Sequence, residues 1–170
     1  MKKILWLLFT CGLVFGVEVA KKPQLVSIGG ENGGYVKDNT AWSSAMLKEK
    51  VFVVFYVDPD EKDKNEHFVQ ALKAKHYDRK NYGSVAIINM AATWKPNFII
   101  AKILASKQKE FKDTIYVKDK TGVLVKKWNL ADNNSDVLVF DKDGALLFYK
   151  AGALNESDMK EVFELIETHI

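Results

Sequence analysis

The run V-F-V-V-F-Y-V, residues 51–57, constrains the fold of this chain more than any other stretch. All seven positions are apolar or aromatic, and four of them are valine. A strand with one face in water alternates apolar and polar residues, whereas a short continuous run of this composition is typical of a strand covered on both faces. We therefore expect residues 51–57 to lie inside a sheet that has other layers on both sides.

A second run of the same kind, S-V-A-I-I-N-M, follows at residues 84–90. Between the two runs, residues 61–75 place Phe68 and Leu72 on one side and many charges elsewhere, which predicts an amphipathic helix. Strand, helix and strand in this order predict a right-handed unit with parallel strands. A further helix is expected over residues 96–111, because the proline that opens this segment suits a first helical turn.

Two hairpins and a closing helix are predicted in the second half of the chain. The pattern of residues 114–128 predicts a hairpin that turns at 119–122, and that of residues 136–150 predicts another that turns at 141–144. Asn155 is a good N-cap for a final helix, whose apolar residues form one stripe.

The first part of the mature chain is expected to contain only a short strand and an irregular turn. Residues 25–28 predict a brief strand, and the glycine-rich stretch G-G-E-N-G-G-Y, residues 29–35, predicts a turn. A parallel strand–helix–strand unit, a hairpin and a closing helix together predict an α/β, thioredoxin-like fold, in which a central mixed β-sheet is flanked by helices. Residues 17–170 are expected to form this single domain.

The N-terminal residues 1–16 have the form of a secretory signal peptide. Lys2 and Lys3 precede an apolar run that is too short to span a bilayer. Val14 and Gly16 supply the small residues that cleavage after Gly16 requires, and a retained anchor is the alternative. We therefore expect an exported protein, periplasmic in a cell with an outer membrane, with no stable membrane span once the signal peptide is removed.

The composition argues against two classes of function. Cys11 is the only cysteine and lies within the predicted signal peptide. Thiol–disulfide exchange needs a thiolate and a second thiol, so it is excluded unless Cys11 is retained. Loss of Lys2 and Lys3 lowers Lys+Arg from 25 to 23 against 22 Asp+Glu, which leaves a formal charge of about +1 and gives no reason to expect a nucleic-acid partner.

Several motifs resemble a known family. They are W-S-S-A-M-L followed by K-V-F-V-V, the stretch from Asp119 to Leu130 that ends in K-W-N-L, V-L-V-F-D-K-D-G, and G-A-L-N-E-S-D. Together, and in this order, they resemble the YtfJ family of exported bacterial proteins. The resemblance implies a thioredoxin-like fold with no established activity. Family members have been labelled transcriptional regulators, an alternative that the signal peptide and the nearly neutral charge argue against.

The resemblance to thioredoxin-like oxidoreductases also shows where this chain departs from them. Those proteins carry a buried strand, then W-C-x-x-C, then a helix. Aligned from Phe55, the motif would place its cysteines at Asp60 and Asp63. Their cis proline precedes a strand of the last hairpin, where this chain has Ser135 and Asp136 before Val137.

The carboxyl ends of the two parallel strands are the expected place for a site, because ligand sites of α/β proteins gather there. The loop after Val57 and the loop M-A-A-T-W-K-P-N both open on that edge. The candidate binding surface consists of Asp58, Asp60, Asp63, Thr93, Trp94 and Asn97. The favoured hypothesis is a binding or accessory module whose partner is an envelope protein of unknown identity.

The alternative is an enzyme or metal-binding protein that uses the carboxylates after Val57. An EF-hand beginning at Asp58 would need a third oxygen donor, a glycine and a glutamate where Lys62, Asp63 and Val69 stand. We therefore predict no metal and no cofactor, and expect these carboxylates to cap the following helix. Trp42, Trp94 and Trp128 could line a ligand or partner groove, but core packing is the default for aromatic residues beside buried strands. Trp94 is the main candidate for a groove, because it falls between a strand and the following helix.

Overall fold

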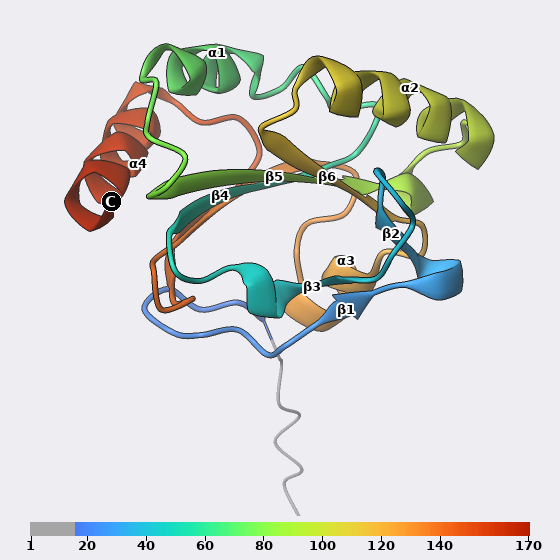
Figure 1. The fold of residues 1–170 in the computed structure, drawn as a ribbon, viewed down its shortest axis with the longest axis horizontal. Helices are drawn as coiled ribbons and strands as arrows, with labels where there is room; N and C mark the ends of the chain where they lie inside the picture. Colours follow the sequence, from blue (N-terminus) through green and yellow to red (C-terminus); the bar gives the residue numbers. More distant parts are fainter. Residues whose placement is uncertain (1–15) are drawn as a thin grey trace, which may run out of the picture.

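The computed structural model describes residues 16–170 (Figure 1). Most of the predicted signal peptide, with Cys11, lies outside the described residues. Six strands form one mixed sheet in the order β2-β6-β5-β4-β7-β8. They are β2 (Gly33–Tyr35), β4 (Val51–Val57), β5 (Tyr82–Asn89), β6 (Thr114–Asp119), β7 (Ser135–Phe140) and β8 (Leu146–Ala151). The pairs β4–β5 and β5–β6 are parallel, and the other three pairs are antiparallel.

Strand β4 is buried along nearly its whole length, as predicted, and the two faces of the strand serve different layers. Val51, Val53 and Phe55 pack in a cluster with α1 and α4. The alternate residues, including Val54 and Tyr56, belong to the cluster on the opposite face.

Helices α1 (Glu66–Ala74), α2 (Asn97–Glu110) and α4 (Glu156–His169) lie on one face of the sheet. The short sheet of β1 (Ser27–Ile28) and β3 (Trp42–Ser43) lies on the other face, with α3 (Val123–Trp128) (Figure 1). Three short 3-10 turns, η1 (Gly30–Asn32), η2 (Ser44–Met46) and η3 (Met90–Ala92), complete the order of elements. Within residues 16–170, no helix is long and apolar enough to cross a bilayer.

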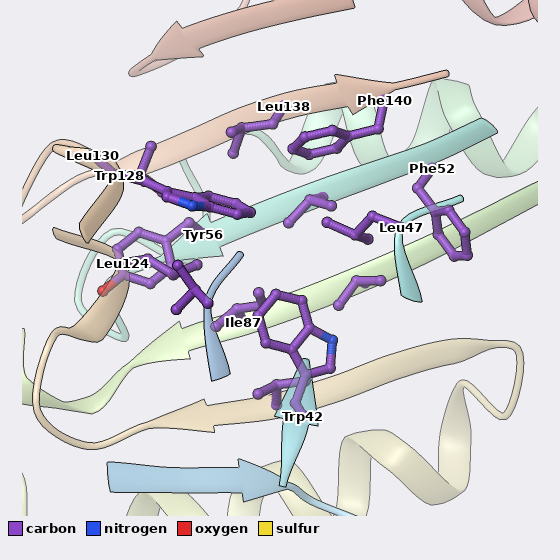
Figure 2. Packing of buried hydrophobic residues seen from close by; sticks show 14 of the residues in the cluster. Trp42, Leu47, Phe52, Tyr56, Ile87, Leu124, Trp128, Leu130, Leu138 and Phe140 are labelled. Atoms are coloured by element: carbon purple, nitrogen blue, oxygen red, sulfur yellow. The ribbon is translucent and has the colours of Figure 1, made fainter. Parts of the chain in front are cut away.

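Two tryptophans fill the core on the β1/β3 side, as the sequence predicts. Figure 2 shows Trp128 beside Leu138 and Phe140, and Trp42 beside Ile87, and both indoles are almost fully buried. The Trp128 Nε1–H donates to the carbonyl of Gln24 at 2.9 Å, so this buried polar group is satisfied.

The hairpin predicted over residues 114–128 is wrong. Strand β6 covers its first part, but Val123–Trp128 form helix α3. The cause is Asp119, whose carboxylate accepts the backbone N–H groups of Val123 at 2.9 Å and Leu124 at 3.1 Å. These contacts satisfy free N–H groups at the start of the helix, as a cap does. The Tyr56 hydroxyl donates to the same carboxylate at 3.1 Å.

Two further boundaries differ from the prediction. The brief strand expected at residues 25–28 is limited to Ser27–Ile28. The turn predicted at residues 29–35 includes β2, which pairs with β6 at the sheet edge. Gly33 has a φ of 128°, and a Cβ there would lie 1.8 Å from the Lys118 carbonyl oxygen, so this close strand pairing requires glycine. The hairpin at residues 136–150 and the Asn155 N-cap are both confirmed.

Replacement of Asp119 tests the origin of α3. We expect Asp119→Ala to lower the free energy of unfolding by about 3 kcal/mol, because it removes a cap and leaves the buried Tyr56 hydroxyl without an acceptor. Urea unfolding followed by tryptophan fluorescence measures this loss. The control Asp113→Ala, at an exposed position before β6, should change stability by less than about 0.5 kcal/mol. Equal effects of the two variants would contradict this role of Asp119.

Candidate functional site

One edge of the sheet carries a row of buried polar residues. The parallel strands β4, β5 and β6 all end there, with Asp58 directly after β4, Asn89 closing β5 and Asp119 closing β6. Ser135, at the start of antiparallel β7, pairs with Val57 at the same edge. All four polar residues are buried. This carboxyl edge is where the sequence predicts the site.

Asn65 connects this edge to the second half of the chain. Its Nδ2 donates to the carbonyl of Gly152 at 3.0 Å and to Ser135 Oγ at 3.1 Å, and its Oδ1 accepts the N–H of Leu154 at 2.9 Å. The side chain is therefore occupied by residues around β7 and β8. It makes no capping hydrogen bond to helix α1, although Asn65 is the residue that precedes that helix.

The predicted start of α1 at Glu61 is wrong. The helix begins at Glu66. Residues 58–65 form successive turns, in which Glu61 N–H donates to the Asp58 carbonyl at 3.0 Å and Lys64 N–H donates to the Glu61 carbonyl at 3.1 Å. The predicted capping role of Asp58, Asp60 and Asp63 is wrong for the same reason: the first helical turn lies beyond them.

The loop after β4 and the loop after β5 are joined through Asp60. Thr93 Oγ1 donates to Asp60 Oδ2 at 2.8 Å, and the Lys95 ammonium forms an ion pair with the other Asp60 oxygen. Asp58 lies beneath this contact, and its Oδ1 accepts the Asp60 N–H at 2.8 Å. Burial, and next the negative charge of Glu61, raise the pKa of the Asp58 carboxyl.

The other predicted surface residues border this contact without joining it. Trp94 follows Thr93 and is 86% exposed. Asn97 is exposed at the first position of α2. Asp63 has a side chain that is 79% exposed and pairs with its neighbour Lys62. The structure thus brings Asp60 and Thr93 together, buries Asp58 under them and leaves Trp94 projecting from the same loop.

Asp136 is a buried carboxylate that sequence reasoning did not single out. One of its oxygens accepts the Ala131 N–H at 2.9 Å and the Tyr149 hydroxyl at 3.3 Å. The other oxygen has no hydrogen-bond partner within residues 16–170. Burial raises the pKa of Asp136 to about 6. The signal that could have found it is an acidic residue at the start of the buried strand S-D-V-L-V-F.

Asn89 is a second polar residue at this edge with unused bonding capacity. Its Nδ2 donates to Asp132 Oδ1 at 2.8 Å, while its own Oδ1 has no partner in the described part of the chain. Within residues 16–170, no three His, Cys, Asp or Glu side chains gather as metal ligands would. Instead, the carboxylates after β4 each have a separate partner: Lys95 for Asp60, Lys64 for Glu61 and Lys62 for Asp63.

Sheet order, flanking helices and this polar edge define a thioredoxin-like protein. A thiol-disulfide isomerase from Corynebacterium glutamicum aligns at 17% identity and a TM-score of 0.58, covering 80% of this chain and 90% of that one. A peroxiredoxin-like protein from Aquifex aeolicus aligns at 11% identity and a TM-score of 0.63, covering 91% of this chain and 89% of that one. At such identities the likeness shows the fold alone.

The chain belongs to the YtfJ family, described as "Bacterial protein of unknown function (YtfJ_HI0045)", which matches residues 14–169. It is 29% identical over 129 residues to the uncharacterized protein YtfJ of Escherichia coli K12 and 30% identical over 129 residues to an uncharacterized protein of Haemophilus influenzae. Each alignment covers 74% of this chain and 70% of the relative. The family and fold expected from the sequence are therefore confirmed.

The buried carboxylate predicts a specific dependence of stability on pH. Because the pKa of Asp136 is raised from 3.8 to about 6, the folded protein holds this proton between those values while the unfolded chain releases it. The stabilisation is complete below pH 3.8 and is lost as the pH rises through 6. Relative to Asp136→Asn, the native protein should lose roughly 2.5 kcal/mol of unfolding free energy between pH 4 and pH 7.

Urea unfolding of both proteins at several pH values measures this difference. Asp63→Asn, at an exposed position, is the control. Its plot of unfolding free energy against pH should run parallel to that of the native protein. Parallel curves for the native protein and Asp136→Asn would show that Asp136 titrates normally.

Proposed function

We propose that this protein is an exported, periplasmic binding or accessory module of the cell envelope that uses a thioredoxin-like fold without a redox pair. The observation that supports it most is the Asp60 contact with Thr93 and Lys95, which joins the two loops at the carboxyl edge and leaves Trp94 exposed beside them. A protein partner of the envelope is the proposed ligand.

The physical argument is that this arrangement supplies what a recognition surface needs. Association is weakened when loops must be ordered on binding, so loops that are already tied together lower that cost. Tryptophan is among the residues that carry most of the binding energy at interfaces. Trp94 lies on such a loop and keeps most of its indole free for contact.

The contacts of the loop carboxylates favour binding over catalysis. A general base must reach its substrate. Asp60 is engaged by Thr93 and Lys95, whereas Asp136, whose pKa is suited to proton transfer near neutral pH, is fully buried. The cysteine-dependent chemistry of thiol-disulfide proteins has no residue to perform it between residues 17 and 170.

Site-specific photo-crosslinking in living cells tests the binding surface. A photoreactive amino acid at Asp63 or Asn97, both exposed beside the loop contact, should give the same discrete protein adduct from either position. The same probe at Glu161, exposed on α4, is the control and should not give that adduct. Asp60→Ala should reduce the adduct several-fold, because it releases the two loops. Absence of adducts, or an equal yield from Glu161, would contradict the proposal.

Export has its own test. The full chain expressed in Escherichia coli should appear in the periplasmic fraction with the intact mass of residues 17–170, since cleavage is expected after Gly16. Deletion of residues 2–16 should leave the protein in the cytoplasm. An unprocessed cytoplasmic product from the full chain would contradict export.

A further inference from the structure

Helix α2 (Asn97–Glu110) carries large apolar side chains outside the stripe that packs on the sheet. Ile100 and Leu104 are buried in a cluster with Ile88 and Met90 at the end of β5. Surface helices of soluble domains normally carry polar residues on the face opposite the core. Here the exposed residues include Phe98, which is 75% exposed, with Ile99 and Ile103, and the exposed Lys102 and Lys109 lie between them around the helix.

Trp94 extends this apolar surface beyond the start of the helix. With Phe98, Ile99 and Ile103 it accounts for four of the seven large apolar residues that are exposed within residues 16–170. Figure 1 shows α2 in the layer of helices that α1 and α4 also form on one face of the sheet. No other element of the described chain covers this side of the helix.

Positive charge is concentrated on the same segment. Residues 95–113 contain five lysines, Lys95, Lys102, Lys107, Lys109 and Lys112, against two acidic residues, Glu110 and Asp113. The segment therefore carries a formal charge of about +3, while the whole mature chain carries about +1. Lys102 and Lys109 are exposed and form no ion pair with another residue of the described chain.

We propose that α2 and Trp94 dock this protein on an anionic phospholipid surface. Helices that lie in a membrane interface place tryptophan, phenylalanine and aliphatic residues among the headgroups and present lysines on their flanks. Lysine side chains suit this geometry, since their stems lie along apolar groups while their ammonium groups reach the lipid phosphates. The excess of lysine complements anionic lipid and gives no comparable preference for an uncharged apolar partner.

Docking of this kind is reversible and differs from anchoring. The exposed apolar set is four side chains, far fewer than the 20 or so consecutive apolar residues of a spanning helix. It would hold the loops at the carboxyl edge close to the bilayer, because Trp94 follows Thr93, which contacts Asp60.

Vesicle binding by the protein that begins at Val17 tests the inference. This chain retains every described helix and strand and lacks the apolar residues of the predicted signal peptide, which would bind lipid by themselves. At low salt, at least tenfold more protein should co-sediment with vesicles containing 30% phosphatidylglycerol than with pure phosphatidylcholine vesicles. Tryptophan emission should shift to the blue, because Trp94 is exposed whereas Trp42 and Trp128 are already buried.

Matched variants separate docking from general attraction between charges. Phe98→Asp combined with Ile103→Asp should abolish binding and the blue shift. Lys102→Glu combined with Lys109→Glu should reduce binding at least tenfold. The control, Lys48→Glu with Lys142→Glu, has the same net charge at exposed positions outside α2 and should bind like the unaltered protein. Thermal unfolding of each variant shows that it is folded.

Three results would overturn the proposal. The first is no preference for anionic vesicles, and the second is an equal loss of vesicle binding in the two lysine double variants. The third is self-association that Phe98→Asp abolishes, which would assign the face to a second copy of the chain.

The proposed binding function can fail independently of this inference. Its crosslinks at Asp63 require a protein partner, so they can appear when vesicle binding is absent and can be absent when vesicle binding is present.

Discussion

The side chain of Asn65 is the contact on which the arrangement of the site depends. It binds the start of β7 through Ser135, the residue after β8 through Gly152, and the segment before α4 through Leu154. These groups are backbone or side-chain atoms that would otherwise be buried without partners, and unsatisfied buried polar groups are costly. One amide side chain thus fixes where α1 can begin relative to the start of β7 and the end of β8.

The polar edge, which Asn65 joins through Ser135, turns the strand ends into a defined surface. Asp119 holds the start of α3, and Asp58 holds the turn on which Asp60 lies. Asp60 then meets Thr93 from the neighbouring strand end. What reaches the solvent is a joined pair of loops with a projecting indole, beside a helix that exposes both apolar side chains and lysines. Both features suit recognition of another surface, whether a protein or a membrane.

The elements that follow from local pattern were predictable from the sequence. Residues 51–57, the hairpin at 136–150 and the helix after Asn155 carry their own periodicity or capping residues, and the meeting of the two loops follows from the parallel strands. The start of α1 was not predictable, because Asn65 contacts residues far away in the sequence. Helix α3 depends on short-range contacts of Asp119 with Val123 and Leu124, but the local pattern does not show that the Tyr56 hydroxyl binds the same buried carboxylate. Asp136 was missed as a site residue because its contacts with Ala131 and Tyr149 are not visible in the sequence, although its place in an apolar strand was a signal.

The most direct test of this account is amide hydrogen exchange at Leu154, measured by NMR. This N–H belongs to no helix or strand and has Asn65 Oδ1 as its acceptor. If Asn65 holds the site together, the Leu154 amide exchanges as slowly as the Val54 amide within β4, and becomes fast in Asn65→Ala while Val54 stays protected. Rapid exchange of Leu154 in the native protein, at the rate of an exposed amide such as that of Lys112, would contradict the account.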